Sequence, residues 1–181
     1  PAYNYSGVGT NRWPTNKYLN IYIVECISSA TYSCPVTSGA YIGGYTYLPG
    51  STPYTANTNS GDAIVMLRNQ VAVASPTDSR TLSHEIGHWL NLSHTFGSTN
   101  NPLFDPSNMP TAPVSCGTDN VADTPPTGGY FSICSPSSFD CSNPPNIENI
   151  MDYASCPKMF TQGQITRMRT ALTSATGGRS N

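Results

Sequence analysis

The three histidines of this chain all lie in one stretch, HEIGHWLNLSH, which runs from His84 to His94. Helical residues four apart leave the same face one turn apart, so the spacing predicts that His84 and His88 project together. Glu85 lies beside them, within reach of a water molecule held by a metal. Asn91 can end the helix in a left-handed conformation, after which the chain can return His94 as a third ligand. Three protein nitrogens with one open position are typical of catalytic zinc, whereas structural zinc has four closed ligands.

The alternative interpretation is a surface helix that carries stray histidines. A helix places Leu82, Ile86, Trp89 and Leu90 in one apolar stripe, with the histidine pair on roughly the opposite side. We therefore expect these histidines to lie outside the packed core. An HExxH pattern alone is common by chance, but a third histidine behind a turn-forming residue makes a zinc site the favoured interpretation.

Composition bounds the class of protein. A length of 181 residues suits one domain, which could be built as two lobes around a cleft. The formal net charge of -2 offers no basic surface for nucleic acid and no polybasic patch for a membrane. No apolar run approaches transmembrane length. We therefore expect neither nucleic acid nor a membrane as a partner.

Six cysteines allow two interpretations, a structural metal site or disulfide bonds. The sequence has no C-x-x-C spacing, and its metal-type spacing uses histidine. Disulfides are therefore favoured, and they indicate an oxidising, exported setting. Six cysteines permit fifteen pairings, among which spacing alone does not choose. The chain opens with Pro1 and has no signal peptide, so we expect a processed or trimmed chain.

The local patterns predict three strands and two helices. β-branched and aromatic residues predict strands over 17–27 and 41–48, and a wholly apolar run predicts a strand over 63–67 that is buried on both faces. The motif helix is expected over about 79–91, with Asp78 as its N-cap.

The second half of the chain is expected to be mostly irregular. Residues 95–148 show little periodicity, but four cysteines lie in or beside them, so we interpret this stretch as stapled structure rather than disorder. A capping box at 161–164 predicts a last helix that ends at Gly177-Gly178. Strands, the motif helix, loops and a last helix together predict a mixed α+β domain.

A second motif, NIMDY, places Met151 and Tyr153 downstream of the histidines. Each residue taken alone would be interpreted as packing. Together with the long zinc motif, they resemble the metzincin metallopeptidases and, within this clan, the pappalysin family. The segments that carry the resemblance are YLNIYIV at 18–24, HEIGHWLNLSHTFG at 84–97, CGTDNVADTP at 116–125 and NIMDYASCPKMFTQGQITRM at 149–168.

The resemblance implies a zincin-like α+β fold over a single catalytic domain, 1–181. Its upper lobe, about 1–91, would carry a twisted mixed sheet and the active-site helix. Its lower lobe, about 92–181, would be irregular, stapled by disulfides and closed by the C-terminal helix. The activity it implies is that of a secreted zinc endopeptidase that cleaves proteins or peptides.

Individual roles follow from the same resemblance. Glu85 is implied as the general base, Met151 as the hydrophobic floor beneath the metal, and Tyr153 as a hydroxyl near it. The implied zinc ligands are His84, His88 and His94. Zinc and Glu85 would activate a water, and zinc and Tyr153 would stabilise the oxyanion. The substrate would lie extended along an exposed sheet edge. The alternatives are a zinc amidase that acts on cell-wall peptides and a non-catalytic zinc-binding module, which Glu85 disfavours.

The resemblance also implies the disulfides. It suggests two interleaved bridges in the lower lobe, Cys116–Cys141 and Cys134–Cys156, which leaves Cys26–Cys34.

A structural calcium ion is implied in the loop 116–125. Its ligands would be Asp119 and Thr124, with main-chain oxygens near Thr118 and Val121, and hydrogen bonds within the loop would hold Asp123. The alternative for such an Asp/Asn-rich segment is an ordinary turn.

The chain departs from the pappalysin pattern at three places. Asn91 stands where family members usually have glycine, and asparagine tolerates positive φ best among other residues. Ala154 and Ser155 stand in a shortened segment where an acidic residue accompanies a preference for basic side chains, which puts that preference in doubt. Only some seventeen residues precede the YLNIYIV strand, so we expect an upstream piece of the domain, or a cleaved segment, that could remain bound.

Overall fold

The structure is a computed structural model that describes residues 13–14, 17–28, 34, 41–50, 62–71, 80–141 and 144–173. The chain divides into two compact units, one of Pro1–Leu90 with Ala171–Asn181 and one of Asn91–Thr170. None of the helices in these described ranges is long and apolar enough to cross a membrane.

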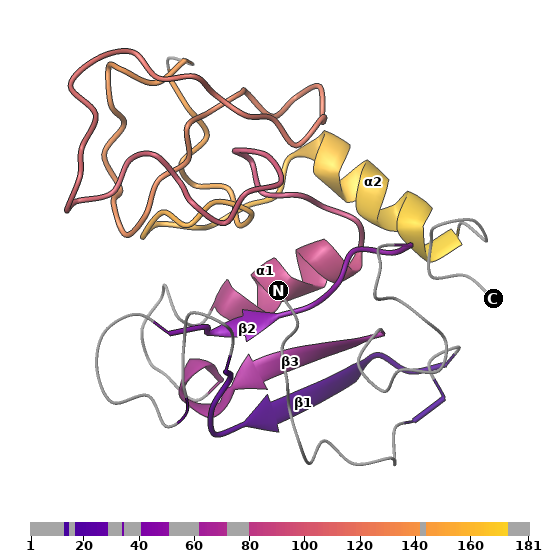
Figure 1. The fold of residues 1–181 in the computed structure, drawn as a ribbon. Coiled ribbons are helices and arrows are strands. Elements are labelled where there is room, and N and C mark those ends of the chain that lie inside the picture. The colour runs from indigo at the N-terminus through magenta and orange to yellow at the C-terminus, as the bar shows by residue number, and fades with distance from the viewer. Residues whose placement is uncertain are drawn as a thin grey trace. The chain divides into compact units, whose positions relative to one another are not determined.

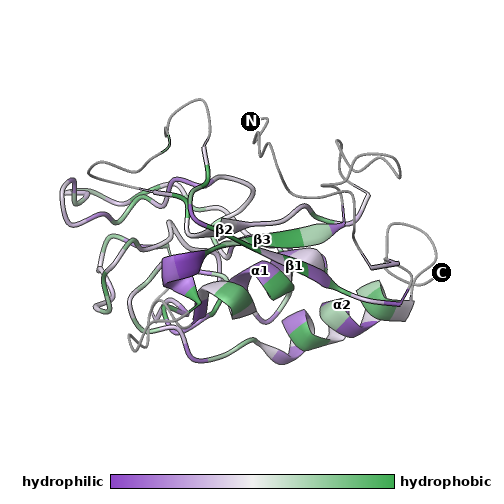
Figure 2. Ribbon diagram, turned by 90° about the horizontal axis from the view of Figure 1, so that it is seen from below, coloured by the Kyte–Doolittle hydropathy of each residue, from purple (hydrophilic) through white to green (hydrophobic). Residues whose placement is uncertain are grey.

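The first unit contains a three-stranded mixed sheet in the order β1-β3-β2 (Figure 1). Strand β1 (Asn20–Val24) runs parallel to β3 (Ala63–Leu67), and β2 (Gly44–Tyr45) runs antiparallel to β3. All five residues of β3 are buried, which confirms the prediction of a strand covered on both faces. Figure 2 shows the same strand as hydrophobic.

Two of the strands are shorter than the sequence patterns predict. The first was expected over 17–27, but regular pairing begins at Asn20, whose side chain bonds the N–H and the carbonyl of Trp13. The second was expected over 41–48, but only Gly44 and Tyr45 pair with β3. Both errors arise because strand propensity marks residues that suit a sheet, whereas strand length depends on the partner strand.

The core of the first unit lies on one face of the sheet. It contains Ile27, Tyr45, Val65 and Leu67, and Tyr22, Val24, Ile42 and Tyr47 pack against it. Ile64 and Met66 alternate onto the other face of β3 and are also buried. A short 3₁₀ turn, η1 (Arg68–Gln70), follows β3.

Helix α1 (Thr81–Trp89) carries the histidine motif and was expected over 79–91. Asp78, the predicted N-cap, lies outside the described residues. The buried positions of α1 are His84, Glu85 and Gly87. Of the predicted apolar stripe, Leu90 is buried, whereas Leu82, Ile86 and Trp89 are only half-buried.

The burial of Glu85 is explained by the contact between α1 and β2. A Cβ atom built on Gly44 would lie 3.2 Å from Glu85 Cγ and 2.8 Å from Met66 Sδ. Because β2 has no side chain at this point, the face of α1 that bears Glu85 approaches the sheet, and Glu85 is buried.

In its described residues, the second unit is irregular apart from helix α2 (Gln162–Thr173), whose last three residues belong to the first unit. Its core contains Phe104, Tyr130, Ile147 and Ala154, with Val114, Ile133, Phe139 and Cys156 packed against it. The predicted capping box is confirmed, since Gln164 N donates to Thr161 Oγ1 at 3.2 Å and Thr161 N donates to Gln164 Oε1 at 3.0 Å. The predicted helix end at Gly177-Gly178 lies outside the described residues.

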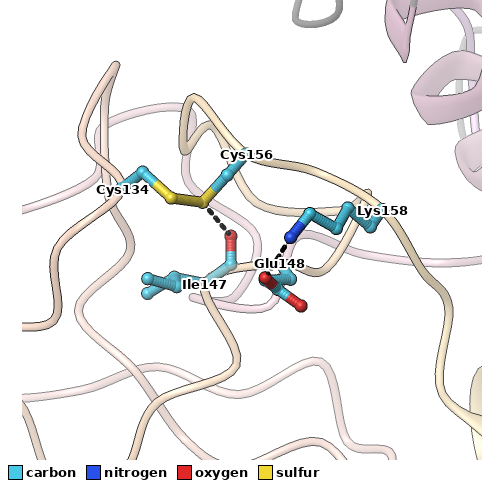
Figure 3. A network of polar contacts seen from close by, with 5 residues as sticks. All are labelled: Cys134, Ile147, Glu148, Cys156 and Lys158. Carbon is cyan, nitrogen blue, oxygen red and sulfur yellow. Dashed lines mark hydrogen bonds and ion pairs between the residues drawn. A yellow bond between two sulfur atoms is a disulfide. The ribbon is translucent and has the colours of Figure 1, made fainter.

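Three disulfides are present, Cys26–Cys34, Cys116–Cys141 and Cys134–Cys156. They are the pairs that the resemblance implies, and they use every cysteine. Figure 3 shows the Cys134–Cys156 bridge beside the ion pair of Lys158 Nζ and Glu148 Oε1, which are 2.6 Å apart. The bridge and the ion pair each join a residue that precedes the NIMDY turn, Cys134 or Glu148, to a residue that follows it, Cys156 or Lys158.

Candidate metal centre

Helix α1 places two histidines and a carboxylate on one turn. The rings of His84 and His88 lie 4.7 Å apart, nearly perpendicular at 88°. His84 is buried and His88 is half-buried. The expectation that both histidines lie outside the packed core is therefore wrong for His84, which is 8% exposed.

Glu85 lies between the two histidines and is 5% exposed. Within the described part of the chain, its Oε2 atom has no hydrogen-bond partner. Burial raises the pKa of this carboxyl to about 8. A buried carboxylate oxygen without a donor is costly to the fold, so its retention in the motif fits a group that serves chemistry rather than packing.

The turn after α1 is set by local backbone geometry. The helix ends when Leu90 N donates to the carbonyls of Ile86 and Gly87, and Asn91 then adopts φ of 73°. This left-handed residue is the one that the sequence predicts. Leu92, which the sequence analysis did not single out, is fully buried and anchors the chain after the turn.

His94 is held in one orientation by its own loop. Its Nδ1 atom lies 2.7 Å from the carbonyl oxygen of Thr99. A carbonyl only accepts hydrogen bonds, so Nδ1 carries the proton and Nε2 keeps its lone pair. Histidines that bind a metal through one ring nitrogen usually donate a hydrogen bond from the other ring nitrogen in this way.

The three histidines offer nitrogen atoms that lie within 4.8 Å of one another. Nitrogens that bind one zinc ion at about 2.0–2.1 Å lie at most about 4.2 Å apart, so a movement of about 0.6 Å or less would bring the donors of this cluster to one shared ion. Three imidazoles are donors that zinc accepts well. The residues present therefore fit zinc.

The NIMDY turn and His94 belong to the same unit and lie close together. Met151 is fully buried, and its carbonyl accepts a hydrogen bond from Thr95 N at 3.2 Å. The ring of Tyr153 lies 4.8 Å from that of His94 in an edge-to-face contact. Phe96 stacks on His94 at 4.9 Å, a contact that the sequence analysis missed. The HTFG segment contains this aromatic residue, but its spacing does not reveal the stacking.

Of the predicted calcium ligands, Asp119, Val121 and Thr124 are buried, whereas Thr118 is exposed. Asp119 is 1% exposed, and its carboxylate accepts from Val121 N at 3.0 Å and from Gln164 Nε2 at 2.9 Å. Thr124 is also buried, and its hydroxyl lies 3.3 Å from that of Thr161. The carbonyl of Val121 accepts from Thr124 N.

The expectation that hydrogen bonds within the loop hold Asp123 needs correction. Its carboxylate does not depend on the loop alone, because it accepts from Thr161 Oγ1 and Gly163 N, both at 2.8 Å. It therefore binds the N–H groups and hydroxyl at the start of α2, where an acidic side chain is favoured. The error arose because these donors lie 38 and 40 residues away in sequence.

Gln164 joins this loop to the NIMDY turn. The residue is fully buried; its Oε1 accepts from Asn149 Nδ2 at 2.9 Å, and its Nε2 donates to Asp119. Asn149 Oδ1 in turn accepts from Met151 N at 2.9 Å. A single side chain thus connects three segments through buried polar contacts.

We expect Gln164→Met to lower the free energy of unfolding by about 2–4 kcal/mol, because it leaves buried donors and the Asp119 carboxylate unpaired. Gln162→Met is the matched control, since Gln162 is exposed on the same helix. Chemical denaturation of both variants measures the difference. Equal stability of the two would show that the buried amide contributes nothing.

Comparison with known proteins identifies the family of this chain. The model of a peptidase family described as pregnancy-associated plasma protein-A matches residues 3–173. This chain belongs to that family, the pappalysins. Its fold is accordingly a metzincin fold, and a zinc-binding histidine triad is the feature that the family shares.

Curated pappalysin relatives are about twice as long as the chain. It is 33% identical over 162 residues to an extracellular metalloprotease of Colletotrichum graminicola, an alignment that covers 83% of the chain and 47% of the relative. A Neurospora crassa extracellular metalloprotease is 31% identical over 164 residues, covering 85% of the chain and 48% of that protein. The chain therefore spans about half the length of these relatives.

Solved pappalysin structures show the same fold. Mature mirolysin of Tannerella forsythia, in complex with a cleaved peptide, matches with a TM-score of 0.64 and 31% identity over 94% of the chain and 58% of mirolysin. A mutant of promirolysin from the same organism matches with a TM-score of 0.65 and 30% identity, over 94% of the chain and 51% of promirolysin.

Proposed function

We propose that this pappalysin is a secreted zinc endopeptidase whose two units form one catalytic domain. The observation that carries the proposal is the cluster of three histidine nitrogens, two from helix α1 and one from the segment after it. The same helix carries the buried carboxyl group of Glu85. His84, His88 and His94 would hold the zinc ion, which supplies Lewis acidity for the peptide carbonyl and a water of lowered pKa. The disulfides and the extracellular relatives support export.

The chain's own groups divide the remaining chemistry. Glu85 takes the proton of the attacking water and passes it to the leaving amine, a role that its unpaired Oε2 atom suits. The hydroxyl of Tyr153 donates to the oxygen on which negative charge develops. Met151, buried and fixed by Asn149, provides a rigid apolar floor.

The substrate is proposed to bind as an extended strand beside β2. Among the described strands, β1 and β2 are the two edge strands of the sheet, and each pairs with β3 alone. Gly44 of β2 lies against Glu85, so a peptide that pairs with β2 would run past the general base. Mature mirolysin, a relative of this chain, has been solved in complex with a cleaved peptide.

The test is digestion of a casein-type substrate by the zinc-loaded chain, with and without a chelator. Cleavage that the chelator abolishes supports an endopeptidase. Cleavage of cell-wall peptides alone would favour the amidase alternative. Zinc binding without either activity would favour the non-catalytic module.

Tyr153→Phe is expected to lower kcat by about 10-fold or more while KM changes little, because the hydroxyl acts on charge that develops in the transition state. Tyr18→Phe is the control, since Tyr18 is 51% exposed. Steady-state kinetics on one peptide measure both constants. An unchanged kcat would return Tyr153 to a packing role.

We also propose that calcium binds in the loop 116–125, with Asp119 and Thr124 as side-chain ligands and Thr118 and Val121 as carbonyl ligands. These hard oxygen donors suit calcium, which takes six to eight of them including waters. Burial raises the pKa of Asp119 despite its hydrogen bonds, which indicates that nearby donors only partly offset desolvation of the charge. A cation would offset the rest.

Removal of calcium, with zinc kept saturated, should therefore lower both the melting temperature and turnover. Calorimetry and peptide assays across a calcium titration measure these effects, and magnesium at equal ionic strength is the control. If neither quantity changes and elemental analysis finds no calcium, the loop is an ordinary turn held by Gln164 and Arg167.

A further proposal concerns the exposed side of β1. Ile21 and Ile23 are 41% and 57% exposed on the face where Ile64 and Met66 are buried. We propose that an upstream segment of a longer protein, or a cleaved piece of it, covers this face. Adding more of the natural N-terminal sequence should raise the melting temperature and protect β1 amides from hydrogen exchange. No gain in protection would contradict this.

A further inference from the structure

Asp152 is a buried carboxylate that the proposed reaction does not use. The residue is 4% exposed. Its Oδ2 accepts the hydroxyl of Thr95 at 2.6 Å, and its Oδ1 accepts Tyr130 N at 2.9 Å and Ala154 N at 3.2 Å. One side chain therefore binds three segments of the second unit that are far apart in sequence.

Each end of the Thr95–Asp152 contact adjoins a group of the candidate centre. Thr95 follows His94, and Asp152 precedes Tyr153. The rings of His94 and Tyr153 meet at 4.8 Å, and Thr95 N also bonds the carbonyl of Met151 at 3.2 Å. The side-chain hydrogen bond, the backbone hydrogen bond and the ring contact therefore all join residues 94–95 to residues 151–153.

We propose that Thr95 and Asp152 are positioning residues whose hydrogen bond holds the His94 imidazole against Tyr153 and so strengthens zinc binding by the third histidine. The inference rests on the proposed zinc site. Its physical basis is that His94 lies beyond a turn, away from the rigid helix that carries the other two histidines. The loop around His94 must therefore be fixed by tertiary contacts, and supporting contacts of metal ligands commonly change metal affinity by about 10–100-fold.

The hydrogen bond from Thr95 also stabilises the buried carboxylate of Asp152. Burial raises the pKa of Asp152 to about 6 even with its donors in place. Loss of the Thr95 hydroxyl removes a hydrogen bond of 2.6 Å from this buried carboxylate, so the segment that carries His94 is expected to shift until water replaces that donor.

Thr95→Val and Thr95→Ser in the full chain separate this role from packing. Valine keeps the shape and loses the hydroxyl, whereas serine keeps the hydroxyl. We expect Thr95→Val to raise the zinc dissociation constant about 10-fold and to alter the visible spectrum of the cobalt-substituted protein. Thr95→Ser should remain within about twofold of the wild type in the same competition assay with a chelator.

A purely structural role would lower the melting temperature of the metal-free protein and leave the zinc affinity and the cobalt spectrum unchanged. That result for a folded Thr95→Val would overturn the inference. If Thr95→Val does not fold, Asp152→Asn and the double variant Asp152→Asn, Thr95→Val decide. The amide keeps Oδ1 for Tyr130 and Ala154 and can donate to the Thr95 hydroxyl. Weaker zinc binding by the double variant alone supports the inference, and equal binding overturns it.

These readouts do not need peptide cleavage. A wild-type chain that binds zinc but cleaves no peptide would contradict the proposed function, and the zinc and cobalt comparisons would still decide the role of Thr95 and Asp152.

Discussion

Glu85→Ala is expected to lower kcat by about 10²–10⁴-fold while the protein stays folded and zinc stays bound. Glu85 is adjacent to the histidines and is not one of the three clustered donors, so its loss should spare the metal. The substitution also removes a buried carboxylate with an unpaired oxygen, so the melting temperature should stay level or rise. Steady-state kinetics, zinc analysis and thermal unfolding of the same sample measure kcat, the bound zinc and the melting temperature.

Glu25→Ala is the matched control, because the Glu25 side chain is 77% exposed and pairs with Arg68 at the surface. Exposed pairs of this kind contribute little, so its activity and stability should match the wild type. Near-normal turnover by zinc-loaded Glu85→Ala would contradict the general-base role. Loss of zinc from that variant would instead assign Glu85 to the metal site itself.

Removal of the Cys134–Cys156 bridge, as Cys134→Ser with Cys156→Ser, is expected to cost about 3.4 kcal/mol of unfolding free energy. The chain-entropy estimate for a separation of 22 residues gives this value. Cys156 follows Met151 closely and packs on the second unit's core, so the NIMDY turn should loosen and turnover should fall even well below the melting temperature.

The control is Cys26→Ser with Cys34→Ser, which opens a bridge of separation 8 in the first unit. Its expected cost is about 2.5 kcal/mol, similar in size, yet it should leave turnover of the folded protein unchanged. Thermal unfolding and peptide assays at low temperature compare the pairs. Equal loss of turnover in both would show that general destabilisation, and not the turn, controls activity.

Several features were predictable because they depend on neighbouring residues alone. The periodicity of α1 fixes the spacing of His84 and His88, and asparagine's tolerance of positive φ fixes the turn at Asn91. The capping box at Thr161 is likewise set by residues three apart. The wholly apolar run 63–67 has no polar face to expose, so its burial on both sides follows from composition.

The tertiary structure decided which face of α1 is buried. Periodicity predicts that the histidine pair lies outside the packed core, but the missing side chain at Gly44 lets the face of Glu85 approach the sheet, and His84 is buried. Helical spacing places residues on a face, whereas the shape of the neighbouring element selects the face that packs.

The tertiary structure also decided the partners of the buried polar groups. Asp123 bonds the start of α2, Gln164 reaches Asp119, and Asp152 bonds Thr95 across 57 residues of sequence. A buried carboxylate or amide must find donors and acceptors, but any segment that packs nearby can supply them. The sequence by itself therefore determined the zinc motif, its turn and its family, while the long-range packing of the chain determined how the third histidine and the tyrosine are held together.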